Sequence, residues 1–269
     1  MLLAVEVLMR KTLTHLTILI SLFSLLGLAA CGAKDPLSAT DRAWLQKKGV
    51  LNIGVFKGYP PFGFVDKDGK PVGMSIDYWN LLAKKLDFKV QFHPVGFAQQ
   101  LKGLESGEFD SLAGVFPLPS RQQTMDFTRS FYSINTNLFV APDLKDIKTL
   151  KDLPDIPVGV VEGDSSQDLA KKANLKTQVF PGYEATVMAL ATGKIQAIIL
   201  DAPVAAYYIK IKGLKGKIRK VPQLLMQGWM TLPVKEGNTH LLEILDQGIA
   251  EVSPQEWQAI EKKWVAPSK

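Results

Sequence analysis

The sequence predicts an α/β protein of two similar lobes, each with a mixed, mostly parallel sheet flanked by helices. Runs of apolar, strand-like residues alternate with segments of helical period, which is the pattern of βαβ units. Segments 104–114 and 190–200 share one design: a helix end, a Ser/Thr-Gly stop and an apolar strand. Segments 53–58 and 158–163 are short β-rich runs that end in a glycine turn. Because the two pairs are spaced differently along the chain, they favour two lobes of one architecture over a tandem repeat.

The composition is that of a globular protein with a sizeable core. The chain has 269 residues, of which 46% are hydrophobic and 22% are charged, and its formal net charge is +6. This length allows one large or two modest domains. A mildly basic charge is by itself weak evidence for a nucleic-acid partner.

The N-terminal segment, residues 1–30, has the pattern of a secretory signal peptide. Arg10 and Lys11 precede an apolar run at residues 16–30, and this run is short for a membrane span. Met9 is an alternative start of translation, because "MRKTLTHL" makes the better basic region. Structural expectations for the folded protein therefore begin after this segment.

The apolar run ends in "LAAC", which resembles a bacterial lipobox, and this resemblance implies that Cys31 is acylated and becomes the mature N-terminus. The alternative is cleavage at a nearby position, with Cys31 incidental. Cys31 is the only cysteine of the chain, so it has no partner for an internal disulfide. Residues 31–41 are then expected to be a tether, and the protein a membrane-anchored lipoprotein outside the cytoplasm, in the periplasm or at the cell surface.

Several elements have local signals in chain order. Asp68-Gly69 is the signal of a tight hairpin within "FVDKDGKPVG". Residues 75–86 carry apolar side chains at helical spacing, with Ser75 as the expected N-cap. Residues 88–95, "FKVQFHPV", alternate as a strand, and residues 195–200 read as a buried strand.

Small or acidic residues stand at the ends of four predicted strands: Gly58, Gly114, Gly163 and Asp201. Ligands of open α/β sheets bind beyond the carboxyl ends of the strands. If the two lobes face each other, these strand ends line one cleft. Asp201 is the unusual one, because a carboxylate beside a buried strand needs a cationic partner or water.

Together these segments resemble the extracytoplasmic solute-binding proteins of the polar amino-acid type, bacterial solute-binding protein family 3. The resemblance covers nearly all of the chain after the signal peptide and rests on the order and spacing of several motifs rather than on any one. The motifs are "YPPFGFVDKDGKPVGMSIDYWNLLAKKL", "LESGEFDSLAG", "PSRQQTMDFTRSFY", "VGVVEGDSSQD", "GYEATVMALATGKIQAIILDAPVAAYY" and "WQAIEKKWV".

The resemblance implies the two-lobe periplasmic-binding-protein (Venus-flytrap) fold, in which lobe 1 is built from both ends of the chain. It places lobe 1 at residues 42–138 plus 232–267 and lobe 2 at residues 139–231. The hinge strands are expected near residues 136–141 and 228–234.

The resemblance also implies the residues that bind the ligand. Arg121, seven residues after Gly114, matches the arginine that binds the ligand's α-carboxylate, and a planar guanidinium suits a carboxylate; the alternative is a surface arginine in a polar loop. Asp164 and Ser165 stand at a predicted helix N-terminus, which favours an anion, although plain N-capping explains them too. Asp201 matches the residue that pairs with the ligand's α-ammonium; its alternative is also an N-cap.

Aromatic residues complete the expected site. Tyr59, Phe62 and Phe97 match positions that stack on or cover the ligand, although aromatic residues are often part of a core. Phe116 and Leu118 depart from the family pattern, which often has small hydroxyl residues five and three positions before the arginine. An apolar, aromatic or non-amino-acid carboxylate therefore becomes more plausible as the ligand than a standard polar amino acid.

Other classes of protein fit the sequence less well. A dehydratase branch of the family uses a carboxylic acid three residues after the second-lobe aspartate, where this chain has Val204. His15, His93 and His240 have no spacing that suggests a metal site, and no cofactor is implied. Residues 209–220 are basic, but a solvated surface explains them better than nucleic-acid binding.

The sequence therefore predicts a non-enzymatic, monomeric binding protein. It would capture a small carboxylate-bearing solute, an amino acid or an analogue, between its lobes and deliver it to the permease of a membrane ABC-type transporter. A ligand-sensing lipoprotein that signals to a membrane partner is the alternative.

Overall fold

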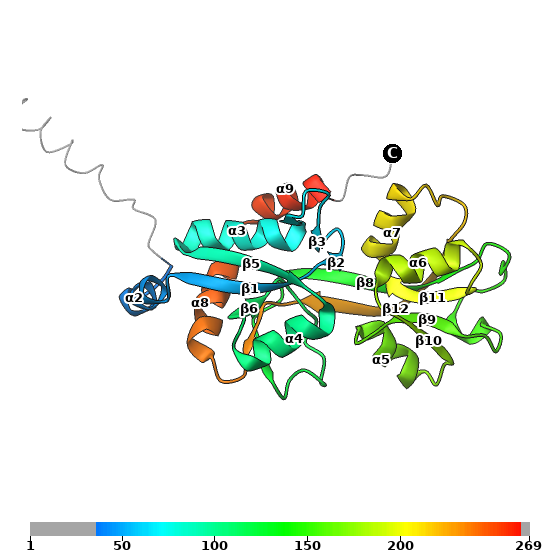
Figure 1. Ribbon diagram of the computed structural model, residues 1–269, viewed down its shortest axis with the longest axis horizontal. Coiled ribbons are helices and arrows are strands. Elements are labelled where there is room, and N and C mark those ends of the chain that lie inside the picture. Colours follow the sequence, from blue (N-terminus) through cyan, green and yellow to red (C-terminus); the bar gives the residue numbers. More distant parts are fainter. Residues whose placement is uncertain (1–35, 265–269) are drawn as a thin grey trace, which may run out of the picture. The chain divides into compact units, whose positions relative to one another are not determined.

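Two five-stranded sheets organise the part of the chain that the computed structural model describes, which is residues 36–264 (Figure 1). Both sheets belong to one unit that begins at Leu37. We call the sheets with their helices lobe 1 and lobe 2. The predicted signal peptide and Cys31 lie outside the described residues. Within these residues no helix has the length and apolarity needed to cross a membrane.

The sheet of lobe 1 has the strand order β5-β1-β6-β13-β7. Strand β1 (Val50–Phe56) runs parallel to its two neighbours, β5 (Lys89–Val95) and β6 (Ser111–Leu112). Strand β13 (Pro233–Lys235) lies antiparallel between β6 and β7 (Met125–Phe127). Lobe 1 therefore takes one of its inner strands from a segment that follows all of lobe 2 in the sequence.

Helices pack on both faces of this sheet. Leu51, Ile53 and Val55 of β1 join one apolar cluster with α3 and α8. On the opposite face Gly54 lies so close to Phe109, after α4, that a Cβ at Gly54 would be 2.6 Å from the ring. The helices of lobe 1 are α2 (Ala39–Lys48), α3 (Met74–Leu86), α4 (Phe97–Ser106), α8 (Thr239–Ala250) and α9 (Pro254–Trp264).

Helix α2 begins inside the segment that was expected to be a tether. The Ser38 side chain accepts a hydrogen bond from the backbone N–H of Asp41, and the Asp41 carboxylate accepts one from the backbone N–H of Ser38 at 3.1 Å. This reciprocal capping starts the helix at Ala39. The expectation of a tether up to residue 41 is therefore wrong for its last three residues.

A three-stranded antiparallel sheet precedes α3, formed by β2 (Gly58–Tyr59), β3 (Gly63–Val65) and β4 (Pro71–Val72). The hairpin predicted at Asp68-Gly69 joins β3 to β4 and is confirmed. Gly69 has a φ of 78°, and the Asp66 carboxylate accepts hydrogen bonds from two backbone N–H groups of the turn.

The predicted helix at 75–86 is confirmed, but Ser75 is not its N-cap. Helix α3 starts one residue earlier, and its N-cap is Gly73, which makes no side-chain hydrogen bond. The backbone N–H groups of Met74 and Ser75 instead donate to the carbonyl oxygens of Pro61 and Phe62 at 2.8 and 2.9 Å. Since the loop supplies these acceptors, no side-chain cap is needed.

The sheet of lobe 2 has the strand order β10-β9-β11-β8-β12. Strand β9 (Val158–Val161) is parallel to β10 (Thr177–Phe180) and to β11 (Ala197–Asp201). Strand β8 (Tyr132–Val140) is antiparallel to β11 and to β12 (Arg219–Met230). Both sheets are mixed, as predicted, and each has two parallel and two antiparallel strand pairings.

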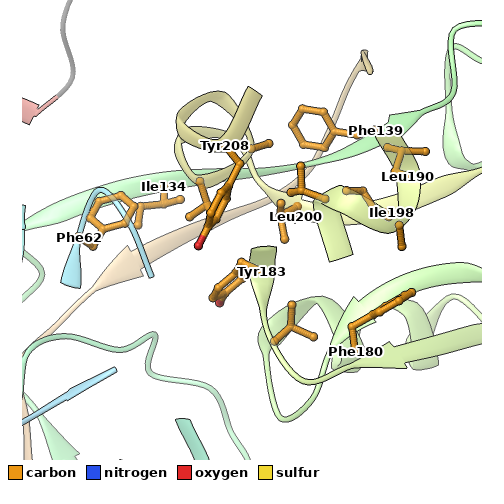
Figure 2. Packing of buried hydrophobic residues seen from close by; sticks show 14 of the residues in the cluster. Phe62, Ile134, Phe139, Phe180, Tyr183, Leu190, Ile198, Leu200 and Tyr208 are labelled. Atoms are coloured by element: carbon orange, nitrogen blue, oxygen red, sulfur yellow. The ribbon is translucent and has the colours of Figure 1, made fainter. Parts of the chain in front are cut away.

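The helices of lobe 2 also lie on both faces of their sheet: α6 (Tyr183–Ala191) and α7 (Ala202–Ile211) on one, α5 (Ser165–Lys172) on the other (Figure 1). Figure 2 shows the first of these cores, where Tyr183, Leu190 and Tyr208 of the helices meet Ile198 and Leu200 of β11. A short 3-10 helix (Leu150–Asp152) precedes β9.

The two segments that were expected to share one design do so. Helix α4 ends with Gly107 in the left-handed region at φ 85°, and α6 is followed by Gly193 at φ 75°. The N–H groups of these glycines donate to Leu104 and Leu190 respectively. Strands β6 and β11 follow, so each lobe repeats a helix, a glycine stop and an inner strand.

The chain enters lobe 2 along β8 and leaves it along β12, and these strands pair with each other at both their ends. The predicted hinge segment 136–141 covers the second half of β8, and the segment 228–234 spans the end of β12 and the start of β13. The lobe boundaries at 138/139 and 231/232 stay predictions.

Candidate functional site

A small cavity of about 30 Å³ lies where residues of lobe 1 and lobe 2 meet. Its lining comes from the carboxyl ends of strands and the first turns of helices, as expected for α/β lobes. The lining residues are Phe56, Tyr59, Phe97, Gln100, Gly114, Val115, Phe116 and Arg121 from lobe 1, and Asp164, Ser165, Tyr183 and Met230 from lobe 2.

The structure brings most of the predicted site residues to this cavity. Those that line it are Tyr59, Phe97, Gly114, Phe116, Arg121, Asp164 and Ser165. Phe62, Leu118 and Asp201 do not line it. Phe62 stacks on the far side of the Tyr59 ring, with centroids 4.9 Å apart, and Leu118 packs against the apolar cluster of lobe 2. Both therefore support the lining rather than form it.

Arg121 is buried at the cavity, with only 7% of its surface exposed, so the alternative of a surface arginine is wrong. One guanidinium nitrogen, Nη1, donates to the carbonyl oxygen of Phe116 at 2.9 Å, and Nη2 donates to that of Gly163 in lobe 2 at 3.4 Å. The guanidinium also lies 5.3 Å from the centroid of the Phe97 ring. None of the ion pairs among residues 36–264 involves Arg121.

Burial lowers the pKa of Arg121 and the negative charge of Asp164 opposes that change. An arginine still remains protonated in proteins, so this is a buried cation held by carbonyl oxygens and an aromatic face. Carbonyl oxygens satisfy hydrogen bonds but do not neutralise the charge. The guanidinium forms no ion pair within residues 36–264, so it is able to bind a carboxylate.

Asp201 is 2% exposed and belongs to lobe 2. It occupies the N-cap position of α7, but its side chain makes no capping hydrogen bond. Its Oδ1 instead accepts a hydrogen bond from the Thr136 hydroxyl, and Oδ2 accepts one from the Tyr59 hydroxyl of lobe 1, both at 2.6 Å. The alternative, a helix N-cap, therefore holds for the position of Asp201 but does not account for its side chain.

No lysine, arginine or histidine of the described chain forms an ion pair with Asp201. Burial, followed by the negative charge of Asp164, raises the pKa of the Asp201 carboxyl to about 7, while the hydroxyl groups of Thr136 and Tyr59 act in the opposite direction. Two hydroxyl donors thus hold a carboxylate that has no cation of its own.

The N-terminus of α5 forms the lobe 2 wall beside Arg121. Asp164 is its N-cap and accepts hydrogen bonds from the backbone N–H of Ser166 at 2.9 Å and from the Tyr183 hydroxyl at 2.5 Å. Capping therefore accounts for Asp164. The Ser165 hydroxyl is buried at the cavity and has no hydrogen-bond partner within residues 36–264. A buried hydroxyl without a partner is costly, and Ser165 shares this feature with its neighbour Ser166.

A continuous aromatic cluster surrounds these charges and crosses between the lobes. The Tyr59 and Tyr183 rings contact each other in a tilted arrangement with centroids 5.0 Å apart, and Phe56 contacts Tyr183 at 5.8 Å and Phe97 at 5.5 Å. Tyr59 lies within electrostatic reach of Asp201, Asp164 and Arg121 alike. All three charged groups therefore belong to one site.

Phe116, the first departure from the family pattern, packs its ring against β12. A Cβ at Gly228 would lie 2.5 Å from that ring, so the glycine makes room for it. Phe116 stands where members of the family often have a small hydroxyl residue. In the structure Thr136 and Tyr59 supply hydroxyl groups at Asp201.

Sequence reasoning missed five lining residues: Phe56, Gln100, Val115, Tyr183 and Met230. Phe56 ends a predicted strand and could have been found by the rule of strand ends. Gln100 follows Phe97 by three residues, which places both on one helix face. No local pattern distinguishes Tyr183 or Met230 from ordinary core residues.

The chain was compared with families and proteins of known sequence or structure. Residues 51–267 match the bacterial extracellular solute-binding proteins, family 3. The "Probable amino-acid-binding protein YxeM" of Bacillus subtilis (strain 168) is 28% identical over 231 residues, which are 83% of each chain.

Two solved structures have the same fold with a TM-score of 0.73. An ancestral arginine-binding protein bound to glutamine is 30% identical and covers 80% of this chain and 97% of its own. The ancestral amino acid-binding protein AncCDT-1, a precursor of cyclohexadienyl dehydratase, is 28% identical, and the match covers 84% of this chain and 99% of the other. The chain belongs to family 3 of the bacterial extracellular solute-binding proteins, and its two-lobe periplasmic-binding-protein fold is confirmed.

Proposed function

We propose that this protein binds an amino acid or a close analogue between its lobes and delivers it to an ABC-type transporter in the membrane. The observation that carries the proposal is a pair of buried ionisable groups of opposite sign, Arg121 in lobe 1 and Asp201 in lobe 2, neither of which forms an ion pair within residues 36–264. Buried charges are normally paired. A zwitterion carries the two missing partners on one small molecule.

In this proposal the ligand carboxylate binds the Arg121 guanidinium and the Ser165 hydroxyl, at the positive end of α5. The ligand ammonium binds Asp201, with Thr136 and Tyr59 beside it. Hydroxyl groups that donate to a carboxylate retain lone pairs, so they are able to accept from an ammonium as well. Names of relatives support an amino-acid ligand: YxeM is named for amino acids, and the ancestral protein was solved with glutamine.

We propose that binding involves a change of conformation. The free space between the lobes is small, about 30 Å³. The bonds from Tyr59 to Asp201 and from Arg121 to Gly163 join the lobes across this space. We propose that these bonds open to admit the ligand and that ligand contacts with both lobes stabilise the closed state again.

A catalytic role has little support in the residues. The match to a precursor of cyclohexadienyl dehydratase raises the possibility of that chemistry. The position three residues after Asp201 is Val204, which is fully buried and has no proton to donate. Among the described residues no group of three or more His, Cys, Asp and Glu is placed to hold a metal ion. We infer a monomeric binding protein without an enzymatic activity.

The ligand is expected to stabilise the purified protein against heat. A ligand that binds only the folded state adds about 2.7 kcal/mol at a concentration one hundred times its Kd. A thermal-shift screen against the amino acids and small organic acids is expected to raise the Tm for at least one amino acid. A screen in which no amino acid raises the Tm, while a titration also detects no heat, would contradict the proposal.

We further propose that Cys31 carries a lipid that anchors the protein to a membrane. The basis is the "LAAC" sequence, because Cys31 lies outside the described residues. Replacing Cys31 with serine is expected to move the protein from the membrane fraction to the soluble fraction, as seen by immunoblotting of both. An unchanged distribution would argue against lipidation.

A further inference from the structure

Gln100 is a lining residue that the proposed zwitterion clamp does not use. It lies in the second turn of α4 and is only 1% exposed. Its backbone N–H bonds to Gly96, but its side-chain amide has no hydrogen-bond partner within residues 36–264. The Gln100 amide is not one of the fully sealed, unpartnered polar groups of the described chain, and Gln100 lines the cavity.

The surroundings make a glutamine unexpected at this position. Val115, Phe116 and Met230 contribute apolar surface to the same cavity, and Phe97 lies one helical turn before Gln100. An aliphatic side chain would fill such a place without leaving an amide unbonded. Because an unpartnered amide costs folding free energy, its presence here points to a partner that arrives with the ligand.

The proposed clamp leaves one part of the ligand for Gln100. Phe97, on the same face of α4, contacts the Arg121 guanidinium, and all three residues line one cavity. In the proposed clamp the ligand carboxylate has Arg121 and Ser165 as partners, and the ammonium has Asp201. The ligand's side chain is then the part that lacks a polar partner.

We propose that Gln100 recognises the ligand's side chain, and that the ligand is an amino acid whose neutral side chain carries an amide or a hydroxyl group. This inference rests on the proposed function of the site. An amide offers both a donor and an acceptor, so it pairs with another amide or with a hydroxyl. A charged side chain fits poorly, because Val115, Phe116 and Met230 offer it no opposite charge.

The test compares ligands that differ in one polar group. Glutamine is paired with methionine, and threonine with valine, and each is titrated calorimetrically into the wild-type protein and into Gln100→Met. The wild-type protein is expected to prefer the polar member of at least one pair by tenfold or more. Gln100→Met, which keeps the length of the side chain, is expected to reduce that preference at least fivefold.

The ratio of affinities for the polar and the apolar ligand, measured within one protein, is insensitive to a general loss of stability. If Gln100 had only a structural role, its replacement would leave this ratio unchanged. Gln99→Leu is the matched control, because Gln99 is the exposed neighbour on α4 and should keep the wild-type ratio. Should Gln100→Met fail to fold, Gln100→Leu provides the same comparison.

The outcomes distinguish the two claims. If the wild-type protein binds amino acids but its preference is the same in the Gln100 variant, the role of Gln100 is overturned and the proposed function stands. The inference is also overturned if the apolar member of both pairs binds more tightly to the wild-type protein. If none of the amino acids binds, the proposed function itself fails, and the role of Gln100 with it.

Discussion

Replacing Arg121 with alanine is expected to weaken amino-acid binding by about ten- to one hundredfold or more. A charged hydrogen-bond partner contributes about 1.5–3 kcal/mol, and about 1.4 kcal/mol corresponds to tenfold in Kd. The reason is specific to this site: the guanidinium is buried, and carbonyl oxygens and the Phe97 ring hold it without neutralising it. Isothermal titration with the best ligand of the thermal-shift screen measures the effect.

The free energy of unfolding of Arg121→Ala is not expected to fall as much as its ligand affinity does. Arg121 lacks an ion pair with the described residues, so removing it relieves a buried charge. Its Tm without ligand is expected to be near or above that of the wild-type protein. Arg129→Ala is the matched control, because the Arg129 side chain is 57% exposed and pairs with Asp246 at the surface. Equal affinity of Arg121→Ala and wild type would reject the carboxylate clamp.

Replacing Asp201 with asparagine is expected to weaken the binding of amino acids at least tenfold. The binding of the same compounds without their amino group is expected to weaken much less. Asparagine keeps the shape of the side chain but carries no charge for the ammonium. The comparison isolates the ammonium, because both ligands keep the carboxylate that binds Arg121. Asp155→Asn, at an exposed aspartate paired with Lys176, serves as the control. Equal losses for both kinds of ligand would remove the ammonium role of Asp201.

Asp201 also predicts how stability and binding change with pH. Its pKa in the folded protein is about 7, compared with an ordinary value of 3.8. Between these values the folded state holds a proton that the unfolded state has released, so the stability without ligand falls as the pH rises from about 4 through 7. Asp201→Asn should lack this contribution.

Amino-acid binding should change in the opposite direction. The ligand ammonium needs the ionised carboxylate, so affinity is expected to increase as the pH rises through about 7, and binding should release a proton. Calorimetry in buffers of different ionisation enthalpy counts that proton. An affinity that is flat from pH 5 to 8 in the wild-type protein would contradict a role for Asp201 ionisation.

Local chemistry let the sequence predict much of the fold. Signals a few residues long predict the Asp68-Gly69 hairpin, helix α3 and the glycines that end two helices, Gly107 and Gly193. Ser75 was misread because the acceptors at the start of α3 are the carbonyl oxygens of Pro61 and Phe62, which a loop brings there. Propensity at one position carries no information about such a contact.

The candidate site also has residues that the sequence predicts and contacts that it does not. Asp164 stands between a strand end and a helix start, so position along the chain was enough to propose it, whereas Arg121 was proposed from the resemblance to the family. That Asp201 receives its hydrogen bonds from Thr136 and Tyr59 depends on a neighbouring strand and on the opposite lobe. Gln100 was missed because a glutamine in a helix is normally a solvated residue, and only the packing of the two lobes reveals it as buried.

The insertion of β13 between β6 and β7 has a consequence for how the molecule assembles. Every strand of the second sheet lies within one uninterrupted stretch, from Tyr132 to Met230, so that half is complete in the nascent chain before β13 emerges. The other half must wait for a strand made later, which closes a long loop and raises its contact order. Assembly of the first sheet is therefore expected to finish last.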